Sequence, residues 1–546
     1  MARSKLTATI ARRTRGETGA VRKEPGGRLR VCLVYPNTYR VGMSSLGFQA
    51  VYHLLNADPG VVCERAFVPD AADLADLQRT GAPIITYESR TPIHEFDVIA
   101  FSISFELDYL NVARVLRMAR LPVMSADRSE RHPLVLAGGN AVSINPEPLA
   151  ELVDVFVIGE AETVLDSALA VMRAHRGTRD ELLSALAEQP AIYAPRFPAP
   201  VCRAYVSDLD AWPTHSRLLT RESEFGNLSL VEVSRGCGRG CKFCVTPACY
   251  WPLRWRSAAA VLESARAGLA HRDAVGLVGA AVSDHPEIDE IAEGVAALGA
   301  RLSVSSLRAD SVSEALIGAL AGSGARSITL APEAGSERLR AAIGKGISDE
   351  QFFDALSRAA AAGIKEAKLY FMVGLPGEGE EDLEAIPSFA AACLRKAGLR
   401  RITVAAGAFV PKPDTPFEGE AMPPVRELSR RLRMVREGLR RDRRVRLAFE
   451  SANWSYLEGA LSRGDRRLGP VIARAEESGG GLSAWREAFR EEGISPEEFA
   501  GAPADRQPPA WAFIESGRSG GGRRQRGRPA PAQADPPSCR KAPGTS

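Results

Sequence analysis

The chain has 546 residues, of which 45% are hydrophobic and 25% charged, and its net charge is +3. This length exceeds what one hydrophobic core covers, so we expect two or three domains. The small net charge gives no argument for a nucleic-acid partner, although the basic excess is concentrated locally. The basic N-terminus lacks the apolar core of a secretion signal, and no stretch approaches the roughly 18 apolar residues of a membrane span. We therefore expect a cytoplasmic protein with no membrane partner.

The first part of the chain predicts a sheet domain behind a polar arm. Residues 1–28 are basic and contain glycine, and we expect a flexible basic arm. The apolar run LRVCLVYPN then predicts a buried strand and a turn, and apolar residues at helical spacing in 41–56 predict a helix. Further strands are predicted at Phe96–Ser102, Pro133–Ala137 and Val153–Ile158. Strands that alternate with helices indicate a doubly wound, Rossmann-like sheet over residues 29–195.

A second alternating series follows a Pro-rich linker at residues 196–222. Its predicted strands are Leu230–Ser234, Ala274–Ala281, Arg301–Leu307, Ser327–Pro332, Glu366–Leu375 and Arg401–Phe409. Six such repeats within residues 223–422 indicate a partial (β/α)6 barrel, whose active site would lie at the C-terminal strand ends. Residues 423–515 are Arg-rich and predicted to be helical, and the Gly/Pro/Arg tail at 516–546 is predicted to be disordered.

Three of the nine cysteines stand together in RGCGRGCKFC, directly after the first predicted barrel strand. An odd cysteine count in a reducing compartment argues against structural disulfides. Zinc sites use four ligands, commonly in two pairs, and here a second pair is missing, since Cys249 has an irregular spacing. Three thiolates on one loop suit a [4Fe–4S] cluster with one free iron, whereas ferredoxins use four cysteines. Cys237, Cys241 and Cys244 are therefore the expected cluster ligands.

The same segment resembles the signature of the radical S-adenosylmethionine (SAM) superfamily, including an aromatic residue, Phe243, just before the third cysteine. The resemblance implies that the free iron chelates the methionine part of SAM. One electron from the cluster would then cleave SAM to a 5′-deoxyadenosyl radical and methionine. It also implies an electron donor such as flavodoxin or ferredoxin, while the substrate stays unknown.

Two further segments, LAPEAGSERLRAAIGKG and KLYFMVGLPGE, are similar to segments that line the SAM pocket in one branch of the superfamily. This similarity places Glu333 and Ser336 in the SAM site, where a carboxylate accepts hydrogen bonds from ribose hydroxyls or an ammonium. Arg308 is a candidate partner for the SAM carboxylate. Simpler interpretations are that Glu333 caps a helix and that Arg308 forms a surface ion pair. Gly279-Ala280-Ala281 stands where the superfamily often has Gly-Gly-Glu, so that glutamate is missing.

The first domain resembles the cobalamin-binding-type domain that precedes many radical SAM cores, in YPNTYRVGMSSLG and in LAGGNAVSINPEPLAELVDVFVIGEAE. In the wider cobalamin fold, the histidine of the motif Asp-x-His-x-x-Gly is the lower cobalt ligand. Here Asn37 and Tyr39 stand in place of the Asp and the His, and Gly42 is kept. A protonated phenol is a poor substitute for imidazole. Two interpretations stay open: cobalamin bound without a lower protein ligand, or the fold kept without the cofactor.

The whole chain resembles an uncharacterised group of radical SAM proteins with this N-terminal domain. We expect an enzyme that uses a 5′-deoxyadenosyl radical to modify an unknown substrate, with methylation as its reaction if cobalamin is present. One alternative is an RNA-modifying enzyme like the methylthiotransferases, which normally need a second cluster that the scattered Cys32, Cys63 and Cys202 do not suggest. Another is a non-catalytic iron–sulfur or zinc-binding module in regulation.

The Arg-rich segment RELSRRLRMVREGLRRDRRVRL bears on the RNA alternative. Its apolar stripe is formed by Leu428, Leu432, Val435 and Leu439, and arginines surround it. Such a helix either contacts phosphates or packs on the barrel with its arginines in water. We prefer the solvated helix, because aromatic residues for base stacking are few and glutamates interleave.

Overall fold

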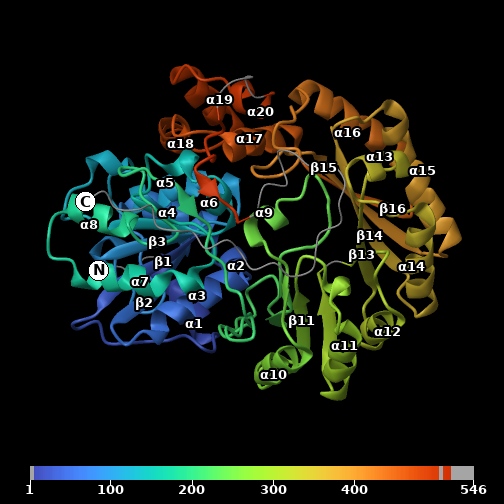
Figure 1. Ribbon diagram of the computed structural model, residues 1–546, viewed down its shortest axis with the longest axis horizontal. Coiled ribbons are helices and arrows are strands. Elements are labelled where there is room, and N and C mark those ends of the chain that lie inside the picture. Colours follow the sequence, from blue (N-terminus) through green and yellow to red (C-terminus); the bar gives the residue numbers. More distant parts are fainter. Residues whose placement is uncertain (1–4, 306, 503–507, 518–546) are drawn as a thin grey trace, which may run out of the picture.

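The computed structural model describes residues 5–305, 307–502 and 508–517. The N-terminal α/β domain and the barrel lie side by side, and the C-terminal helices cross between them (Figure 1). Most of the tail predicted to be disordered lies outside the described residues. Among the described residues, no helix has the length and apolar character needed to cross a bilayer.

The N-terminal sheet has six strands in the order β2-β1-β3-β4-β5-β6. They are β1 (Leu29–Thr38), β2 (Val61–Val68), β3 (Val98–Ser102), β4 (Leu134–Gly138), β5 (Val155–Val157) and β6 (Ile192–Tyr193). All neighbours are parallel except β5 and β6. One face packs against α3 (Leu46–Ala57), α7 (Leu165–Ala174) and α8 (Arg179–Ala187), and the other against α5 (Tyr109–Met118). The predicted doubly wound sheet is confirmed.

Two details of this domain differ from the sequence expectation. The helix expected over 41–56 is broken into α2 (Tyr39–Gly42) and α3, because Ser45 caps α3 by accepting a hydrogen bond from the Phe48 amide at 3.3 Å. Strand β2 was not predicted, since Glu64 and Arg65 interrupt its apolar pattern. In the structure both side chains are buried and have polar partners. Helix α4 (Ala71–Thr80) follows β2.

The prediction of a flexible basic arm is wrong for most of residues 5–17. Residues Lys5–Arg15 form helix α1, because Leu6 and Ile10 stand four positions apart and bury one face on the domain. Arg13 pairs with Asp70 at 2.6 Å and with Glu222 at 3.1 Å. Residues 5–15 are therefore packed on the first domain.

Glu17 anchors this arm through a buried ion pair. Its carboxylate lies 2.7 Å from the Arg65 guanidinium, which also pairs with Glu88 at 2.6 Å, and all three side chains are at most 3% exposed. Removing one partner of a buried pair leaves charge uncompensated, so we expect Glu17→Ala to cost about 3 kcal/mol of stability. Hydrogen exchange of the β1 and β2 amides measures this loss, and the exposed Glu24→Ala is the matched control. Equal protection in both variants would contradict the anchoring role.

The barrel contains seven parallel strands in two sheets, with orders β12-β11-β8 and β13-β14-β15-β16. They are β8 (Ser229–Glu232), β11 (Ala274–Val278), β12 (Arg301–Val304), β13 (Ser327–Glu333), β14 (Glu366–Val373), β15 (Arg401–Ala408) and β16 (Val445–Phe449). A bridge between Leu307 and Leu330 joins the sheets. The outer helices are α10 (Ala258–Leu269), α11 (Ile288–Ala297), α12 (Glu314–Gly322), α14 (Asp349–Ala361), α15 (Glu380–Lys396) and α16 (Val425–Leu439).

All six predicted barrel strands are present, and β16 is an addition. It lies within the segment predicted to be helical, where the charged sequence RVRLAF hid a strand that is buried on one face only. The predicted apolar stripe of α16 is buried as expected. The remaining C-terminal helices are α17 (Ala452–Arg463), α18 (Leu468–Glu477), α19 (Leu482–Glu491) and α20 (Glu497–Ala500). Helix α18 contacts the first domain through Glu476, which pairs with Arg117 of α5 at 2.8 Å.

Candidate active site

The three clustered cysteines lie in the loop between β9 (Ser234–Arg235) and α9 (Thr246–Tyr250), above the C-terminal end of β8. Their thiols are free and half-buried. Gly236 turns the chain into this loop with φ +88°, and a Cβ there would lie 2.6 Å from the Tyr250 carbonyl oxygen. Only glycine fits here, because a side chain at position 236 would clash with the backbone of Tyr250.

A second segment holds the loop from the opposite side, at the end of α13 (Glu337–Ala342). The Lys242 amide donates a hydrogen bond to the Ile343 carbonyl at 2.9 Å, and its ammonium donates to Ala342 at 2.7 Å. A Cβ on Gly344 would lie 2.4 Å from the Gly240 carbonyl oxygen. The position of the thiols therefore depends on this packing.

Burial raises the pKa of the Cys237 and Cys241 thiols, and the positive charges of Arg308 and Lys345 oppose that rise at Cys241. These cations favour the thiolate form, which is the form that binds metals. A zinc site needs four ligands around one ion. Within the described part of the chain, no three Cys, His, Asp or Glu side chains are close enough to share one metal ion. The donor set fits a cluster, in which each thiolate binds a different iron.

Arg308 lies beside the cysteine loop in a network of carboxylates. Its guanidinium donates to both oxygens of Asp310, at 3.0 and 2.9 Å, and approaches Asp284 at 4.0 Å. Arg239 of the loop also donates to Asp284, through two bonds of 2.8 Å. The Arg308 side chain is only 11% exposed, so this is a built network at the site and not a surface ion pair.

Glu333 ends β13 in an unusual backbone conformation, with φ +68° and a shift in the strand register just before it. Residues other than glycine rarely adopt this region, and such strain concentrates at functional sites. Burial raises the pKa of its carboxyl, and Lys345 opposes the rise from 3.2 Å. The helix that follows is capped by Ser336, which accepts a hydrogen bond from the Leu339 amide at 3.1 Å and also bonds Asp382. Glu333 is therefore not the helix cap.

Phe243 packs against an apolar cluster from the turns that follow three barrel strands. The buried members of this cluster are Ala334, Leu339, Ile343, Leu375, Phe409 and Phe417. Ala334 is the neighbour of Glu333, so the aromatic ring and the carboxylate belong to the same end of the barrel. The structure thus gathers the cysteine loop, Arg308, Glu333 and Phe243, while the hydroxyl of Ser336 is engaged in capping. Their contacts with SAM stay predictions.

Comparison with protein families separates two segments of the chain. Residues 231–390 match the model of the radical SAM superfamily, and residues 47–195 match the model described as the N-terminal domain of radical SAM proteins. The chain is a radical SAM enzyme. The segment 231–390 contains the cysteine loop, Arg308 and Glu333, and this finding argues against a non-catalytic regulatory module.

One curated protein and two solved structures are similar to this radical SAM enzyme. An uncharacterised protein of Methanocaldococcus jannaschii, MJ0966, is 29% identical over 448 residues, which are 81% of this chain and 90% of that protein. The radical SAM methyltransferase TsrM of Kitasatospora setae, solved with cobalamin and a [4Fe–4S] cluster, is 13% identical with a TM-score of 0.53. That match covers 85% of this chain and 100% of TsrM, and it shows a shared fold. The cobalamin-dependent enzyme OxsB is 17% identical with a TM-score of 0.47, over 66% of this chain and 52% of OxsB.

The cofactors of the radical SAM domain are a [4Fe–4S] cluster and SAM. When bound, the reduced cluster supplies the electron that cleaves SAM to methionine and a 5′-deoxyadenosyl radical. Cys237, Cys241 and Cys244 are the residues that would hold it, and the glycines around them let the backbone approach closely. Arg239 and Lys242, on the same loop, offset the negative charge of three thiolates.

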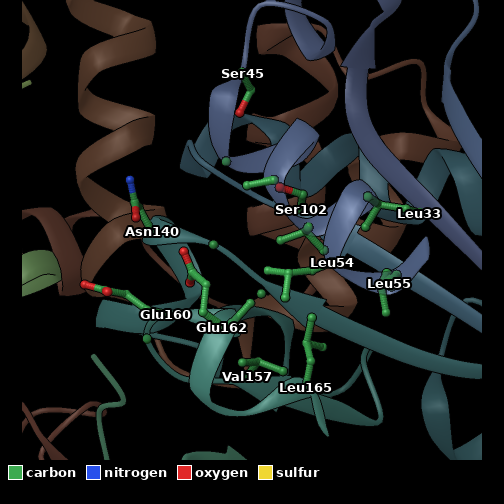
Figure 2. A pocket seen from close by; sticks show the side chains of 18 of the residues that line it. Leu33, Ser45, Leu54, Leu55, Ser102, Asn140, Val157, Glu160, Glu162 and Leu165 are labelled. Atoms are coloured by element: carbon green, nitrogen blue, oxygen red, sulfur yellow. The ribbon is translucent and has the colours of Figure 1, made fainter. Parts of the chain in front are cut away.

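The radical SAM enzyme also has a cavity of about 320 Å³ in its N-terminal domain. Figure 2 shows its apolar wall, formed by Leu33, Leu54, Leu55, Val157 and Leu165, and the polar side chains of Ser45, Ser102, Asn140, Glu160 and Glu162. The cavity is also lined by five residues from outside this domain, Thr214, Glu232, Arg235, Tyr250 and Val278. The cavity therefore lies where the first domain meets the start of the barrel.

Arg235 connects this cavity with the cysteine loop of the radical SAM domain. Its guanidinium pairs with Glu160 at 2.9 Å and with Glu162 at 2.6 Å, both on the first domain, and with Glu232 of β8 at 2.9 Å. The side chains of Arg235, Glu160 and Glu162 are less than a tenth exposed. Since Gly236 and Cys237 follow directly, the buried pairs fix the start of the loop against the cavity wall.

Sequence reasoning missed two lysines at the site. Lys345 is the partner of Glu333. It could have been predicted, because it lies in the segment LAPEAGSERLRAAIGKG, which is similar to segments that line the SAM pocket. Lys412, in FVPKPD, lies 2.7 Å from Glu106 of the first domain and 2.8 Å from Glu458 of α17. Its partners are remote in the chain, and no spacing rule could reveal them. Lys412 ties all three regions together at the C-terminal strand ends.

Proposed function

We propose that this radical SAM enzyme binds a corrinoid and methylates a small organic substrate. The observation that supports the proposal is the cavity lined by both the N-terminal domain and Arg235, the residue that leads into the cysteine loop. A ligand in that cavity lies next to the segment that positions the cluster. The fold shared with TsrM, which was solved with cobalamin and a cluster, adds to this support.

The cavity suits one arm of a large cofactor. Its volume is at the lower end of the range for small-molecule pockets, so it admits a side group while a macrocycle stays outside. Apolar side chains dominate the lining, and a few hydroxyls and carboxylates near the strand ends provide hydrogen bonds. Ala50 of α3 lies in the wall and leaves open space beyond its methyl group.

Tyr39, which stands where the wider fold has its cobalt-binding histidine, belongs to the core. Its hydroxyl donates to Glu17 at 2.7 Å and its ring stacks on Tyr87 with centroids 5.1 Å apart. Burial raises the pKa of the phenol, which stays protonated at neutral pH. Asn37 is likewise engaged, since its amide donates to Asp108 at 2.8 Å. Of the two open interpretations, we therefore propose that the corrinoid is bound without a lower ligand from the protein.

Two observations favour a small substrate over RNA. Arg430 and Arg431 of α16 pair with Glu427, Glu380 and Glu378, so part of the basic face is neutralised. In the sheet register Cys63 lies opposite Val31, which puts the thiols of Cys32 and Cys63 on opposite faces. These two thiols therefore cannot share a second cluster.

We expect Ala50→Trp to abolish corrinoid retention, because the indole fills the cavity. The protein is reconstituted with iron, sulfide and hydroxocobalamin without oxygen, and corrinoid is quantified after gel filtration. The exposed Ala72→Trp on α4 is the matched control and should retain the wild-type amount. Tyr39→Phe should leave the absorption spectrum of the bound corrinoid unchanged.

The same preparation tests methylation. Dithionite is added to reduce the bound corrinoid from Co(III) to Co(I), which can take the methyl cation of SAM and release S-adenosylhomocysteine. With methyl-labelled SAM, we then expect the label on the retained corrinoid of the wild type and not in Ala50→Trp. Equal corrinoid in Ala50→Trp and the wild type, or a changed cobalt spectrum in Tyr39→Phe, would contradict the proposal.

A further inference from the structure

The inner face of the four-stranded barrel sheet carries a row of two cationic and two hydroxyl side chains. In the strand register, Lys368 of β14 lies between Thr329 of β13 and Thr403 of β15, and Thr403 lies beside Arg446 of β16. Register neighbours in a parallel sheet point to the same face. Two hydroxyls, an ammonium and a guanidinium therefore form one row across four strands.

This face points into the barrel and not toward the helices. On β14 the alternate residues Ala367 and Leu369 are buried in the core between sheet and helices. On β16 the alternate residue Phe449 lies under Arg436 of α16, 5.1 Å from the guanidinium carbon to the ring centroid. The row thus occupies the opposite face of the sheet, which is the inner face of the barrel.

The two cations of the row have no carboxylate partner within the part of the chain that the structure describes. The Lys368 ammonium lies 4.5 Å from the centroid of Tyr370, its neighbour on the inner face, and Arg446 is exposed. One row below, Glu366 and Arg401 pair at 3.1 Å and satisfy each other. Charges of one sign in a recess concentrate ions of the opposite sign.

The level above the row carries mostly small side chains. The next inward positions on β13, β15 and β16 are alanines, Ala331, Ala405 and Ala448. The fourth position of that level is Tyr370, whose side chain is 39% exposed. From Lys368 to Met372, at the level of the strand ends, the strand rises about 13 Å. A ligand bound to the row therefore extends toward the end that carries Glu333.

We infer that the substrate is an anionic small molecule whose phosphate or carboxylate binds Lys368 and Arg446 and whose apolar part lies on Tyr370. Guanidinium and ammonium groups, together with hydroxyls, are the donors that such anions prefer. The reacting carbon then lies toward the cysteine loop. The inference rests on the proposed function, because it makes the lumen the substrate site.

The test is a calorimetric titration of the reconstituted enzyme with SAM bound, using pyrophosphate in one series and citrate in the other. We expect the double variant Lys368→Gln/Arg446→Gln to weaken the preferred probe by about tenfold or more. Lys365→Gln and Arg443→Gln, which remove exposed charges away from the inner row, are the controls and should bind as the wild type does. The single variant Lys368→Arg keeps the positive charge and should retain most of the wild-type affinity for the probe. Tighter binding of pyrophosphate would assign a phosphate, and tighter binding of citrate a carboxylate.

Equal affinity in the double variant and the wild type, or no binding of either probe to the wild type, would overturn the inference. Cluster content, corrinoid retention and 5′-deoxyadenosine are measured on the same samples. If these fail while anion binding depends on Lys368 and Arg446, the proposed function falls and the anion site stands. If the cluster, the corrinoid and 5′-deoxyadenosine are all present while anion binding does not depend on Lys368 and Arg446, only the anion site is contradicted. Thermal melting of each variant shows that the fold is retained.

Discussion

Replacing Cys241 by alanine abolishes both cluster assembly and the cleavage of SAM. The reason is that the loop offers three thiolates for three irons, and the loss of one ligand leaves an iron without a protein anchor. Iron and sulfide are quantified after anaerobic reconstitution, and 5′-deoxyadenosine is measured by chromatography after dithionite and SAM are added. We expect the same result for Cys237→Ala and Cys244→Ala.

Cys249→Ala is the matched control for these variants. Cys249 follows the loop within α9 but is 5% exposed, and burial raises the pKa of its thiol to about 12. A thiol that stays protonated is a poor metal ligand. We expect Cys249→Ala to keep its full iron content, and a loss equal to that of Cys241→Ala would identify it as a fourth ligand.

Replacing Gly344 by alanine removes the cluster without touching a ligand. The new Cβ would lie 2.4 Å from the Gly240 carbonyl oxygen, which is backbone of the cysteine loop, so the loop must move. The positive φ adds a strain of about 1 kcal/mol. We expect iron content and 5′-deoxyadenosine formation to fall together, measured as for the cysteine variants.

Gly346→Ala separates the clash from the strain. Gly346 also has a positive φ, +61°, but nothing lies within 4 Å of a Cβ there. This variant should lose similar backbone stability and still assemble its cluster. If both variants lose the same amount of iron, the packing of Gly344 on the loop is not what positions the thiols.

The prediction of the cluster ligands rests on a local signal. Three cysteines at fixed spacing after a strand are readable without tertiary structure. The two segments predicted to line the SAM site lie at the same end of the barrel as the cysteine loop, but the contacts of their single residues were harder to predict. Ser336 turned out to cap α13, and Lys345, the partner of Glu333, was missed. The partner of a carboxylate depends on the strand register and on the shape of the turn that follows the strand. Neither can be predicted from composition.

The elements that sequence reasoning missed share one physical cause. Strand β2 contains Glu64 and Arg65, and α1 belongs to a segment full of arginines, so both look solvated. Their charges are compensated by partners far away in the chain, such as Glu17 and Glu88 for Arg65. Strand β16 was hidden because its inner face is open to the lumen and carries a charge at Arg446. Compensation between distant residues cannot be derived from local periodicity.

The most direct test of the radical chemistry is the wild-type reaction itself. The enzyme is reconstituted without oxygen, reduced with dithionite, supplied with hydroxocobalamin and incubated with SAM. We expect 5′-deoxyadenosine and methionine to form in equal amounts, with none from Cys241→Ala. SAM that stays intact over a fully assembled and reduced cluster would contradict the conclusion that this chain cleaves it.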